Sequence, residues 1–255
     1  MQKVRTQGGR AAGRGSGAGR TVLVTGASGG IGRAVSQAFG AAGWRVGVQY
    51  RTRSTDAART AALVRRRGGV ALCLQADIRD GKQTQEMVNR LVDRWGHLDV
   101  LVCNAGVASH GLVLRMRAEA WAAVVETNLT GTFHCLRAAG PVMARQRDGA
   151  VIVVGSLAAL QGVVGQAAYA ASKAGLMGLV KTTAKEWGKQ NVRVNMVLPG
   201  WHKTALAGSA FPNEVSDDHV LGRTPDLADV AASIYRLALL RDSSGQIWNL
   251  DSRIL

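Results

Sequence analysis

Short apolar runs alternate along this chain with longer segments in which apolar residues recur at the helical period. The seven apolar runs are TVLVT (21–25), RVGVQY (45–50), VALCLQ (70–75), DVLVCN (99–104), AVIVVG (150–155), VRVNMV (192–197) and QIWNL (246–250). Most of them are continuously apolar, which is typical of strands that helices cover on both faces. The amphipathic segments between them include 30–42, 54–67, 81–95, 119–146 and 167–188.

This repeated strand–helix–strand order predicts an α/β fold, with one doubly wound parallel sheet, helices on both faces and right-handed crossovers. We expect a single domain over residues 21–255, because no linker interrupts the alternation. Residues 201–224 have weak periodicity, so we expect a mobile substrate lid there.

Length and composition agree with one domain. A chain of 255 residues that is 47% hydrophobic can bury a substantial core. The longest apolar runs are far shorter than a membrane span, so no membrane segment is expected. Cys73, Cys103 and Cys135 are odd in number and form no C-x-x-C pair. We therefore expect buried free thiols in a reducing compartment, which means a cytoplasmic protein, and no metal site.

The net charge is +15, and five of these charges fall in residues 1–20, a segment rich in Gly and Ala that has no acid. We expect a disordered basic arm over residues 1–20. Such an arm could touch nucleic acid or acidic partners, or could be a solvated tail, which we favour. The remaining charge could steer phosphate cofactors and acidic carrier proteins, or could reflect an arginine-rich proteome.

A glycine-rich loop follows the first apolar run. It reads T-G-A-S-G-G-I-G over residues 25–32 and opens a helical segment. Gly26, Gly30 and Gly32 permit a tight turn and a close approach of the backbone to a pyrophosphate, and the helix N-terminus offers free N–H groups to the anion. A glycine cluster alone is a weak signal, but its place between a first strand and a first helix predicts dinucleotide binding.

The end of the second strand bears on the choice of cofactor. An acid there would accept a hydrogen bond from a ribose 2′-hydroxyl and would repel a 2′-phosphate. This chain has Tyr50 and Arg51 instead, with Arg53 nearby and no acid before Asp56. The pattern favours NADPH over NADH. The alternative is that Arg51 is an ordinary solvated loop arginine.

Small and polar residues follow the next two strands. Asp77 could accept a hydrogen bond from the adenine amino group, and the turn Asn104-Ala105-Gly106 would let the backbone pass close to the adenosine. Each is a weak signal alone, because such residues are common at strand ends. Together they lie at the carboxyl ends of strands, where folds of this class bind ligands.

A candidate proton donor lies beyond the fifth strand. Ser156 follows that strand, Tyr169 lies thirteen positions later, and Lys173 is four residues beyond on the same helical face. A nearby ammonium would lower the tyrosine pKa from about 10, and the phenol could then protonate a carbonyl oxygen as hydride reaches the carbon. Ser156 could donate to the same oxygen, and Asn128 could hold a water beside Lys173. The alternative is a surface Tyr–Lys pair.

These residues carry a family resemblance over residues 21–251. T-G-x-x-x-G-x-G, N-A-G, Y-x-x-x-K, the set Asn128–Ser156–Tyr169–Lys173 and a following P-G match the short-chain dehydrogenase/reductases in order and spacing. The resemblance implies a Rossmann sheet of about seven strands, a homotetramer, and carbonyl/alcohol interconversion with a nicotinamide cofactor. It makes Tyr169 the general acid/base, Ser156 the substrate-orienting donor and Asn128 the anchor of a proton-relay water. It also implies that Lys173 binds the nicotinamide ribose and lowers the pKa of Tyr169.

The expected cofactor site combines the strand-end residues with positions that the resemblance adds. It comprises Thr25, Gly26, Ser28, Gly30, Ile31, Gly32, Tyr50, Arg51, Asp77, Ile78, Asn104, Ala105, Gly106, Tyr169, Lys173, Pro199, Gly200, His202 and Thr204.

Within the family, three stretches look like those of 3-oxoacyl-[acyl-carrier-protein] reductases. They are L-V-L-R-M-R-A-E-A-W-A-A-V-V-E-T-N-L-T-G-T-F (112–133), Y-A-A-S-K-A-G-L-M-G (169–178) and L-G-R-T-P (221–225). Those enzymes use NADPH, which agrees with Arg51, and their partner is an acidic acyl carrier protein, which agrees with the basic body. Arg115 and Arg117 are candidates for that contact, unless they are simply solvated at the start of a helix.

Two stretches depart from the family pattern. W-H-K-T (201–204) stands where a small or apolar residue usually lies two positions before the threonine, and D-S-R (251–253) stands where D-G-G is usual. His202 could face the substrate or only flank the cofactor, and we expect no direct proton transfer from it because Tyr169 already fills that role. The lid over residues 205–220 also looks short. The departures bear on the acyl group rather than on the chemistry.

The sequence therefore predicts an NADPH-dependent reductase of a 3-oxoacyl thioester. One alternative is a different ketone or alcohol substrate, such as a polyketide, steroid, sugar or xenobiotic. An alternative from another class is a non-catalytic dinucleotide-binding protein with a nucleic-acid-binding arm. The intact set of Asn128, Ser156, Tyr169 and Lys173 argues against it, because a pure binder has no need for all four.

Overall fold

The computed structural model describes residues 19–204 and 218–254. Seven strands form one sheet in the order β3-β2-β1-β4-β5-β6-β7, and every neighbouring pair is parallel. The strands are β1 (Thr21–Val24), β2 (Arg45–Tyr50), β3 (Val70–Gln75), β4 (Val100–Cys103), β5 (Gly149–Val154), β6 (Val192–Leu198) and β7 (Ile247–Asn249). The predicted seven-stranded Rossmann sheet is confirmed.

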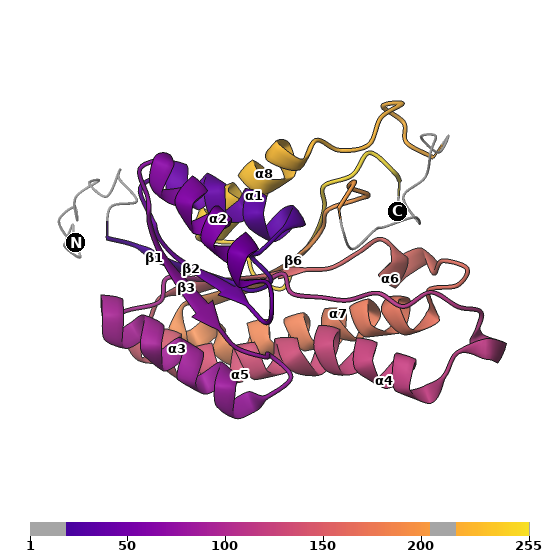
Figure 1. Cartoon of the computed structure of the whole chain (residues 1–255), viewed down its shortest axis with the longest axis horizontal. Helices are drawn as coiled ribbons and strands as arrows, with labels where there is room; N and C mark the ends of the chain where they lie inside the picture. Colours follow the sequence, from indigo (N-terminus) through magenta and orange to yellow (C-terminus); the bar gives the residue numbers. More distant parts are fainter. Residues whose placement is uncertain (1–18, 205–217, 255) are drawn as a thin grey trace, which may run out of the picture.

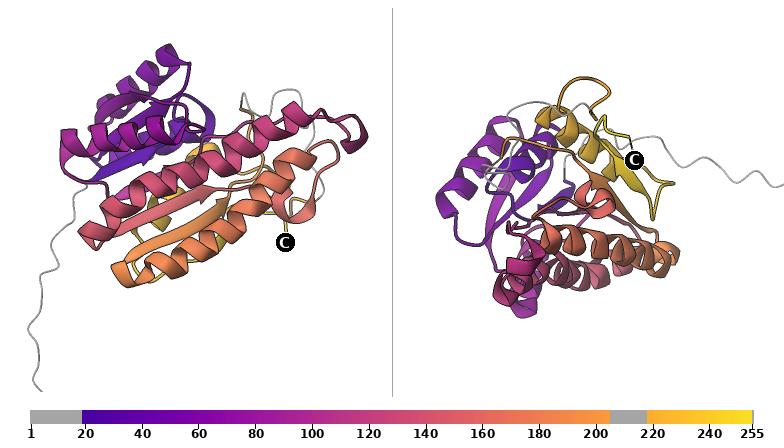
Figure 2. Two further views of the ribbon diagram at one scale, coloured as in Figure 1. Left: turned by 90° about the horizontal axis from the view of Figure 1, so that it is seen from below. Right: turned by 90° about the vertical axis from the view of Figure 1, so that its right-hand side faces the viewer.

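Helices cover both faces of the sheet. They are α1 (Gly30–Ala41), α2 (Ser54–Arg66), α3 (Gly81–Trp95), α4 (Ala118–Val125), α5 (Gly131–Gln146), α6 (Ala158–Gln161), α7 (Ala167–Trp187) and α8 (Leu227–Leu239). Helices α1, α2 and α8 lie on one face, and α3, α5 and α7 lie on the other, with α4 beside α7 (Figures 1 and 2). Among the described helices, none is both long and apolar enough to cross a membrane.

The pleat of each strand divides the buried side chains between two cores. In β1, Val22 and Val24 belong to the core beneath α1, α2 and α8, whereas Leu23 belongs to the core beneath α3, α5 and α7. This division follows from the alternation of side chains along a strand. It explains why most of the strand sequences are apolar at consecutive positions.

The chain reverses its direction of winding at β1, which has β2 on one side and β4 on the other. In doubly wound sheets the connections after such neighbouring strands diverge, and they leave a crevice at the carboxyl edge. The loops after β1, β4 and β5 all end at this edge. They carry the glycine loop, the N-A-G turn and Ser156.

The helical reading of 119–146 needed one correction. The segment is divided into α4 and α5 by a π-helical turn, η2 (Glu126–Thr130). Helix α8 was not singled out in the sequence. The predicted arm lies outside the described residues except for positions 19 and 20, and most of the predicted lid likewise lies outside them.

Candidate active site

The loop between β1 and α1 is held by a buried glutamine. The backbone N–H of Gly26 donates to Oε1 of Gln49 at 2.7 Å, and Nε2 of Gln49 donates to the carbonyl of Ala76 at 2.7 Å. Gln49 thus joins the glycine loop to the end of β3. The sequence analysis missed it, although a polar side chain inside an otherwise apolar strand was a usable signal.

Thr25 and Asn104 join the glycine loop to the N-A-G turn. Oγ1 of Thr25 accepts from the backbone N–H groups of Asn104 and Ala105, each at 3.0 Å. Nδ2 of Asn104 donates to the carbonyls of Thr25 at 2.9 Å and Gly26 at 3.2 Å. Thr25 is 1% exposed, and its hydroxyl positions this turn. Its predicted contact with the cofactor stays a prediction.

Gly32 likewise belongs to the packing beneath the loop. A Cβ added there would stand 2.5 Å from Nδ2 of Asn104 and from the carbonyl of Gly26, so no side chain can be accommodated. Gly32 is buried in this close helix–loop packing, and its expected cofactor contact stays a prediction. Glycine is needed at position 32 because this packing leaves no room for a Cβ.

A cavity of about 420 Å³ opens beside this loop. It fits the adenosine and pyrophosphate of a dinucleotide, because no side chain caps the start of α1 and its first N–H groups remain available to an anion. Predicted cofactor residues that line it are Gly26, Ser28, Gly30, Ile31, Tyr50, Arg51, Asp77, Ile78, Asn104, Ala105, Gly106 and Thr204.

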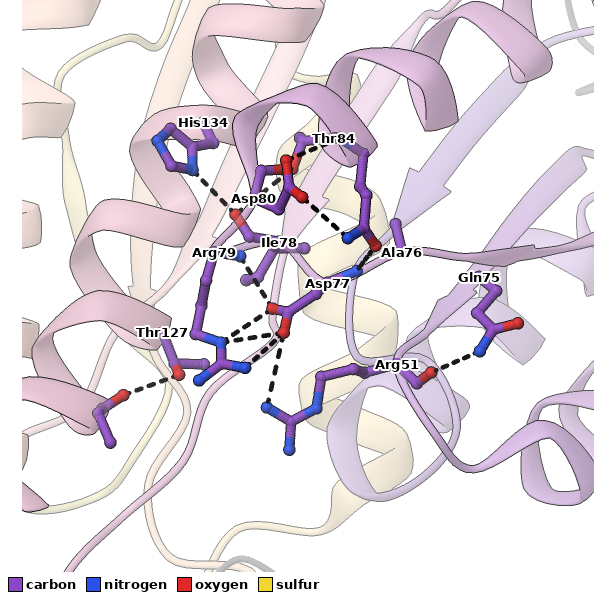
Figure 3. Close-up of polar contacts among 12 residues, drawn as sticks. Arg51, Gln75, Ala76, Asp77, Ile78, Arg79, Asp80, Thr84, Thr127 and His134 are labelled. Atoms are coloured by element: carbon purple, nitrogen blue, oxygen red, sulfur yellow. Dashed lines mark hydrogen bonds and ion pairs between the residues drawn. The ribbon is translucent and has the colours of Figure 1, made fainter.

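Asp77 makes ion pairs that the sequence did not predict (Figure 3). Its carboxylate accepts from Nε of Arg79 at 3.0 Å and from Nη2 at 2.5 Å, and Nη1 of Arg51 lies 4.0 Å away. The Arg79 side chain holds the pKa of this carboxyl below its usual value, and burial opposes the shift only in part. The carboxylate predicted for the adenine amino group is therefore engaged by an arginine, while Arg51 and Arg79 together leave a net positive charge at the end of β2 and β3.

A second cavity, of about 130 Å³, lies next to the first. Ser156, Tyr169 and Lys173 line it, and so do Pro199 and Gly200. It is reached from the carboxyl ends of β4, β5 and β6, as predicted for the reacting groups. The sequence had not placed His110, Gln161 and Gln166, which also line this cavity.

Lys173 is buried and its ammonium has a defined partner. Nζ donates to the carbonyl of Val154 at 2.7 Å and lies 5.7 Å from the centre of the Tyr169 ring. Burial lowers the pKa of Lys173 to about 8, and Cys103 opposes this shift. The ammonium is thus mostly protonated at neutral pH.

The predicted lowering of the Tyr169 pKa is corrected by the geometry. Burial raises this pKa above its ordinary value, and a hydrogen bond with Ser156 opposes the rise. Lys173 directs its ammonium to the carbonyl of Val154 instead of to the phenol oxygen. The phenol of Tyr169 is accordingly neutral at physiological pH.

Asn128 lies in the π-helical turn and is fully buried. Its Oδ1 accepts from the backbone N–H of Val107 at 2.8 Å, and its Nδ2 donates to the carbonyl of Val107 and to Oγ of Ser172. The side chain therefore fastens the loop after β4 to α7, the helix that carries Tyr169 and Lys173. Its predicted role as the anchor of a water stays a prediction.

The W-H-K-T and D-S-R stretches meet at the same cavity. Trp201, His202, Thr204 and Arg253 all line it. Nε2 of His202 lies 2.8 Å from the carbonyl of Pro199, and burial lowers the pKa of this imidazole. His202 is therefore neutral, and one of its ring nitrogens is bonded to the backbone. The expectation that it transfers no proton stays a prediction.

Arg115 and Arg117 lie on the surface ahead of α4. Arg117 pairs with Glu119 at 3.3 Å, and both side chains are exposed. Neither arginine lines either cavity. Their predicted carrier contact stays a prediction.

The family model of the short chain dehydrogenases matches residues 20–215. The chain belongs to this family. The match covers the glycine loop, the N-A-G turn and the helix that carries Tyr169 and Lys173.

Relatives of this short-chain dehydrogenase extend over most of its length. The 3-oxoacyl-[acyl-carrier-protein] reductase of Synechocystis sp. is 37% identical over 235 residues, which are 91% of this chain and 95% of the relative. The 3-oxoacyl-[acyl-carrier-protein] reductase FabG of Staphylococcus epidermidis is 38% identical over 78% of this chain and 80% of its own. A crystal structure of a dehydrogenase/reductase from Sinorhizobium meliloti 1021 superimposes with a TM-score of 0.85 at 28% identity, over 93% of this chain and 96% of that chain.

This short-chain dehydrogenase is therefore an NAD(P)-dependent oxidoreductase that acts on a CH–OH or C=O group. Its cofactor is a nicotinamide dinucleotide, and its similarity to 3-oxoacyl-[acyl-carrier-protein] reductases indicates ketone reduction.

Proposed function

We propose that this short-chain dehydrogenase reduces the ketone of a 3-oxoacyl thioester with NADPH, and that Tyr169 supplies the proton. The observation that carries the proposal is the meeting of Ser156, Tyr169 and Lys173 on one cavity wall. That cavity adjoins the cavity of the glycine loop, with which it shares Ile31, Asn104, Gly106 and Thr204 among other residues. The names of the two reductase relatives support the choice of substrate.

A nicotinamide cofactor held in the adjoining cavity would supply the hydride for the carbonyl carbon. Tyr169 donates its phenolic proton to the carbonyl oxygen, and its raised pKa suits this direction because the phenol stays protonated until the oxygen becomes basic. Ser156 orients the same oxygen by donating a hydrogen bond. Lys173 carries positive charge 5.7 Å from the ring centre, where it stabilises the phenolate that forms.

The preference for NADPH rests on Arg51 and Arg79. Arg51 lines the dinucleotide cavity, and the carboxylate of Asp77, 4.0 Å from it, is already bonded to Arg79. A 2′-phosphate placed there would meet a net positive charge, whereas a 2′-hydroxyl would gain little from it. Tyr50 and Arg51 both line the adjoining cavity.

The carrier and the assembly belong to the same proposal. Arg115 and Arg117 offer cationic side chains to an acidic acyl carrier protein. The rings of Trp121 on α4 and Phe133 on α5 are 43% and 44% exposed, which suits contact between subunits of a homotetramer. We propose that residues 21–255 carry all the catalytic groups and that residues 1–20 contribute none of them.

The proposal is tested by removing the phenolic oxygen of Tyr169. Tyr169→Phe should lower kcat for an acetoacetyl thioester by roughly 10²- to 10⁴-fold, because the general acid is lost. Tyr235→Phe is the matched control, since Tyr235 lies on α8 among aromatic rings far in sequence from the site. The activity of both variants would be measured as the loss of NADPH absorbance at about 340 nm. Free ketones would be tested in parallel. Full turnover by Tyr169→Phe would overturn the mechanism.

A further inference from the structure

We infer that Arg253 forms a carboxylate-binding subsite in the reaction cavity, so that the preferred ketone substrate carries a carboxylate on its carbon chain. This inference deepens the proposed function and rests on it. It assigns a chemical class to the substrate, an oxo acid or a 3-oxoacyl thioester whose chain bears a carboxylate. Neither the family match nor the relatives assign a role to this arginine.

Arg253 comes from the C-terminal segment yet lies on the wall of the cavity that holds Ser156 and Tyr169. Its side chain is 10% exposed, so the guanidinium is largely withdrawn from bulk water. Charge–charge interactions are stronger in such surroundings than at the surface. A substrate held by Ser156 and Tyr169 would therefore sense this cation.

Asp251 holds the guanidinium in place. Its Oδ2 accepts from Nε of Arg253 at 2.8 Å and also from Nη2, while its Oδ1 accepts from the Arg253 backbone N–H at 3.3 Å. Nδ2 of Asn249 donates to the Arg253 carbonyl at 2.8 Å. The arginine is thus fixed along one edge by a carboxylate that is itself 0% exposed.

The other edge of the guanidinium remains available. Within the part of the chain that the structure describes, no acceptor lies within hydrogen-bond distance of Nη1 of Arg253. An arginine that is fixed on one side and open on the other is organised to bind a planar anion, because little side-chain freedom is lost when the ligand arrives.

The charged side chains on the cavity wall are cationic. Among the described residues that line it, Lys173 and Arg253 are the charged side chains, and no Asp or Glu is present. Lys173 directs its ammonium to the carbonyl of Val154, which leaves Arg253 as the cation open to the substrate. Because Asp251 compensates the charge of Arg253 from behind, a carboxylate in this cavity would be held by charge-assisted hydrogen bonds from the free edge of the guanidinium and not by net charge.

The experiment compares pairs of ketones that differ in one charge, with the purified full chain and NADPH. Acetoacetate is paired with methyl acetoacetate, and a 3-oxoacyl thioester ending in a carboxylate is paired with its methyl ester. Wild type should prefer the charged member of at least one pair by about tenfold or more in kcat/KM. The pair that shows the preference identifies whether the carboxylate belongs to a free acid or to an acyl chain.

Arg253→Gln should lower that preference by about tenfold, mainly through a higher KM for the charged ketone. The matched control is Arg193→Gln, because Arg193, at the start of β6, is also ion-paired and largely buried, at 15% exposure, but its partner is Asp148 and it does not line the reaction cavity. Its preference should equal that of wild type. An unchanged preference in Arg253→Gln would overturn the inference.

A measurement on wild type alone keeps the test independent of folding of the variant. Glutarate should inhibit reduction of methyl acetoacetate competitively, and glutaramide should inhibit at least about tenfold less well. Equal inhibition would overturn the subsite. If wild type reduces methyl acetoacetate without any preference for acetoacetate or the acidic thioester, the subsite fails and the proposed function stands. If it reduces none of these ketones, the proposed function itself fails.

Discussion

Lys173 is 4% exposed, and its ammonium donates a hydrogen bond to the carbonyl of Val154. An ammonium in such a site loses hydration that one carbonyl replaces only in part, which is why its pKa falls to about 8. The same shift makes folding pH-dependent, because the unfolded chain would hold this proton more tightly.

The sign of that dependence is definite. Between the folded pKa of about 8 and the ordinary lysine pKa of 10.5, the unfolded state binds more protons, so the free energy of unfolding rises with pH. From about pH 7 to about pH 9.5 the gain from Lys173 is about 2 kcal/mol. Urea unfolding of wild type and Lys173→Met at both pH values would measure it. The variant should lack this gain, and an identical pH response in both proteins would contradict the assignment.

Arg51 provides a second residue-scale prediction. Arg51→Asp should shift the ratio of kcat/KM for NADPH over NADH downward by about tenfold or more, because an acid accepts from a 2′-hydroxyl and repels a 2′-phosphate. Arg90→Asp is the control, since Arg90 is exposed on α3 and does not line the dinucleotide cavity. Cofactor titrations at fixed ketone would measure the ratio. A ratio equal to that of wild type would show that Arg51 does not determine the cofactor preference.

Site residues that meet because of their spacing along one helix could be predicted from the sequence. Tyr169 and Lys173 share a helical face, so their meeting in one cavity follows from helical geometry alone. Gln49 bonds to Gly26 and Ala76, which are more than twenty residues away in the chain, and nothing local marked these partners. Arg79 lies only two residues from Asp77, so their ion pair was a local contact that the sequence analysis missed. The Tyr169 pKa was predicted in the wrong direction because burial depends on the whole environment and not on one neighbour.

At the scale of elements, the strands were the most predictable part of the molecule. Each apolar run became a strand within one or two residues of its predicted bounds, since two-sided burial leaves a continuous apolar pattern. The π-helical turn η2 was not visible, because one extra residue in a helical turn hardly disturbs the apolar period. It sets the place of Asn128 between the β4 loop and α7.

Helix α8 begins at a side-chain cap that can be removed. Oδ1 of Asp226 accepts from the backbone N–H groups of Ala228 at 2.7 Å and Asp229 at 3.2 Å. Asp226→Ala should lower the free energy of unfolding by about 1 kcal/mol, and Asp226→Asn should retain most of it, because an asparagine oxygen caps as well. Urea denaturation of the three proteins is the measurement. Equal losses in both variants would show that charge, and not capping, is involved.

For the whole molecule, the boundary of the folded domain follows from contacts at its first described residues. The carbonyl of Gly19 lies 2.7 Å from Nε2 of His97, the carbonyl of Arg20 accepts from the backbone of Arg45, and the Arg20 guanidinium lies over the Trp44 ring. These contacts tie the residues just before β1 to the loop before β4 and to the start of β2.

A chain that begins at Gly19 should therefore unfold at the same Tm as the full chain, with the same kcat. A chain that begins at Thr21 loses the Gly19 and Arg20 contacts and should unfold about 2–4 °C lower for each kcal/mol lost. Thermal unfolding of the three lengths would decide between these outcomes. A lower Tm for the chain that begins at Gly19 would place residues 1–18 within the folded domain.

Gly200 has a φ of +81°, and a Cβ added there would stand 2.6 Å from Oδ2 of Asp251, the carboxylate that fixes Arg253. The loop after β6 and the segment after β7 therefore pack closely against each other at Gly200 and Asp251. Protein engineers who transplant the C-terminal segment from a relative would have to transplant the loop after β6 with it. Either piece alone would bring a clash or a void to the wall that selects the substrate.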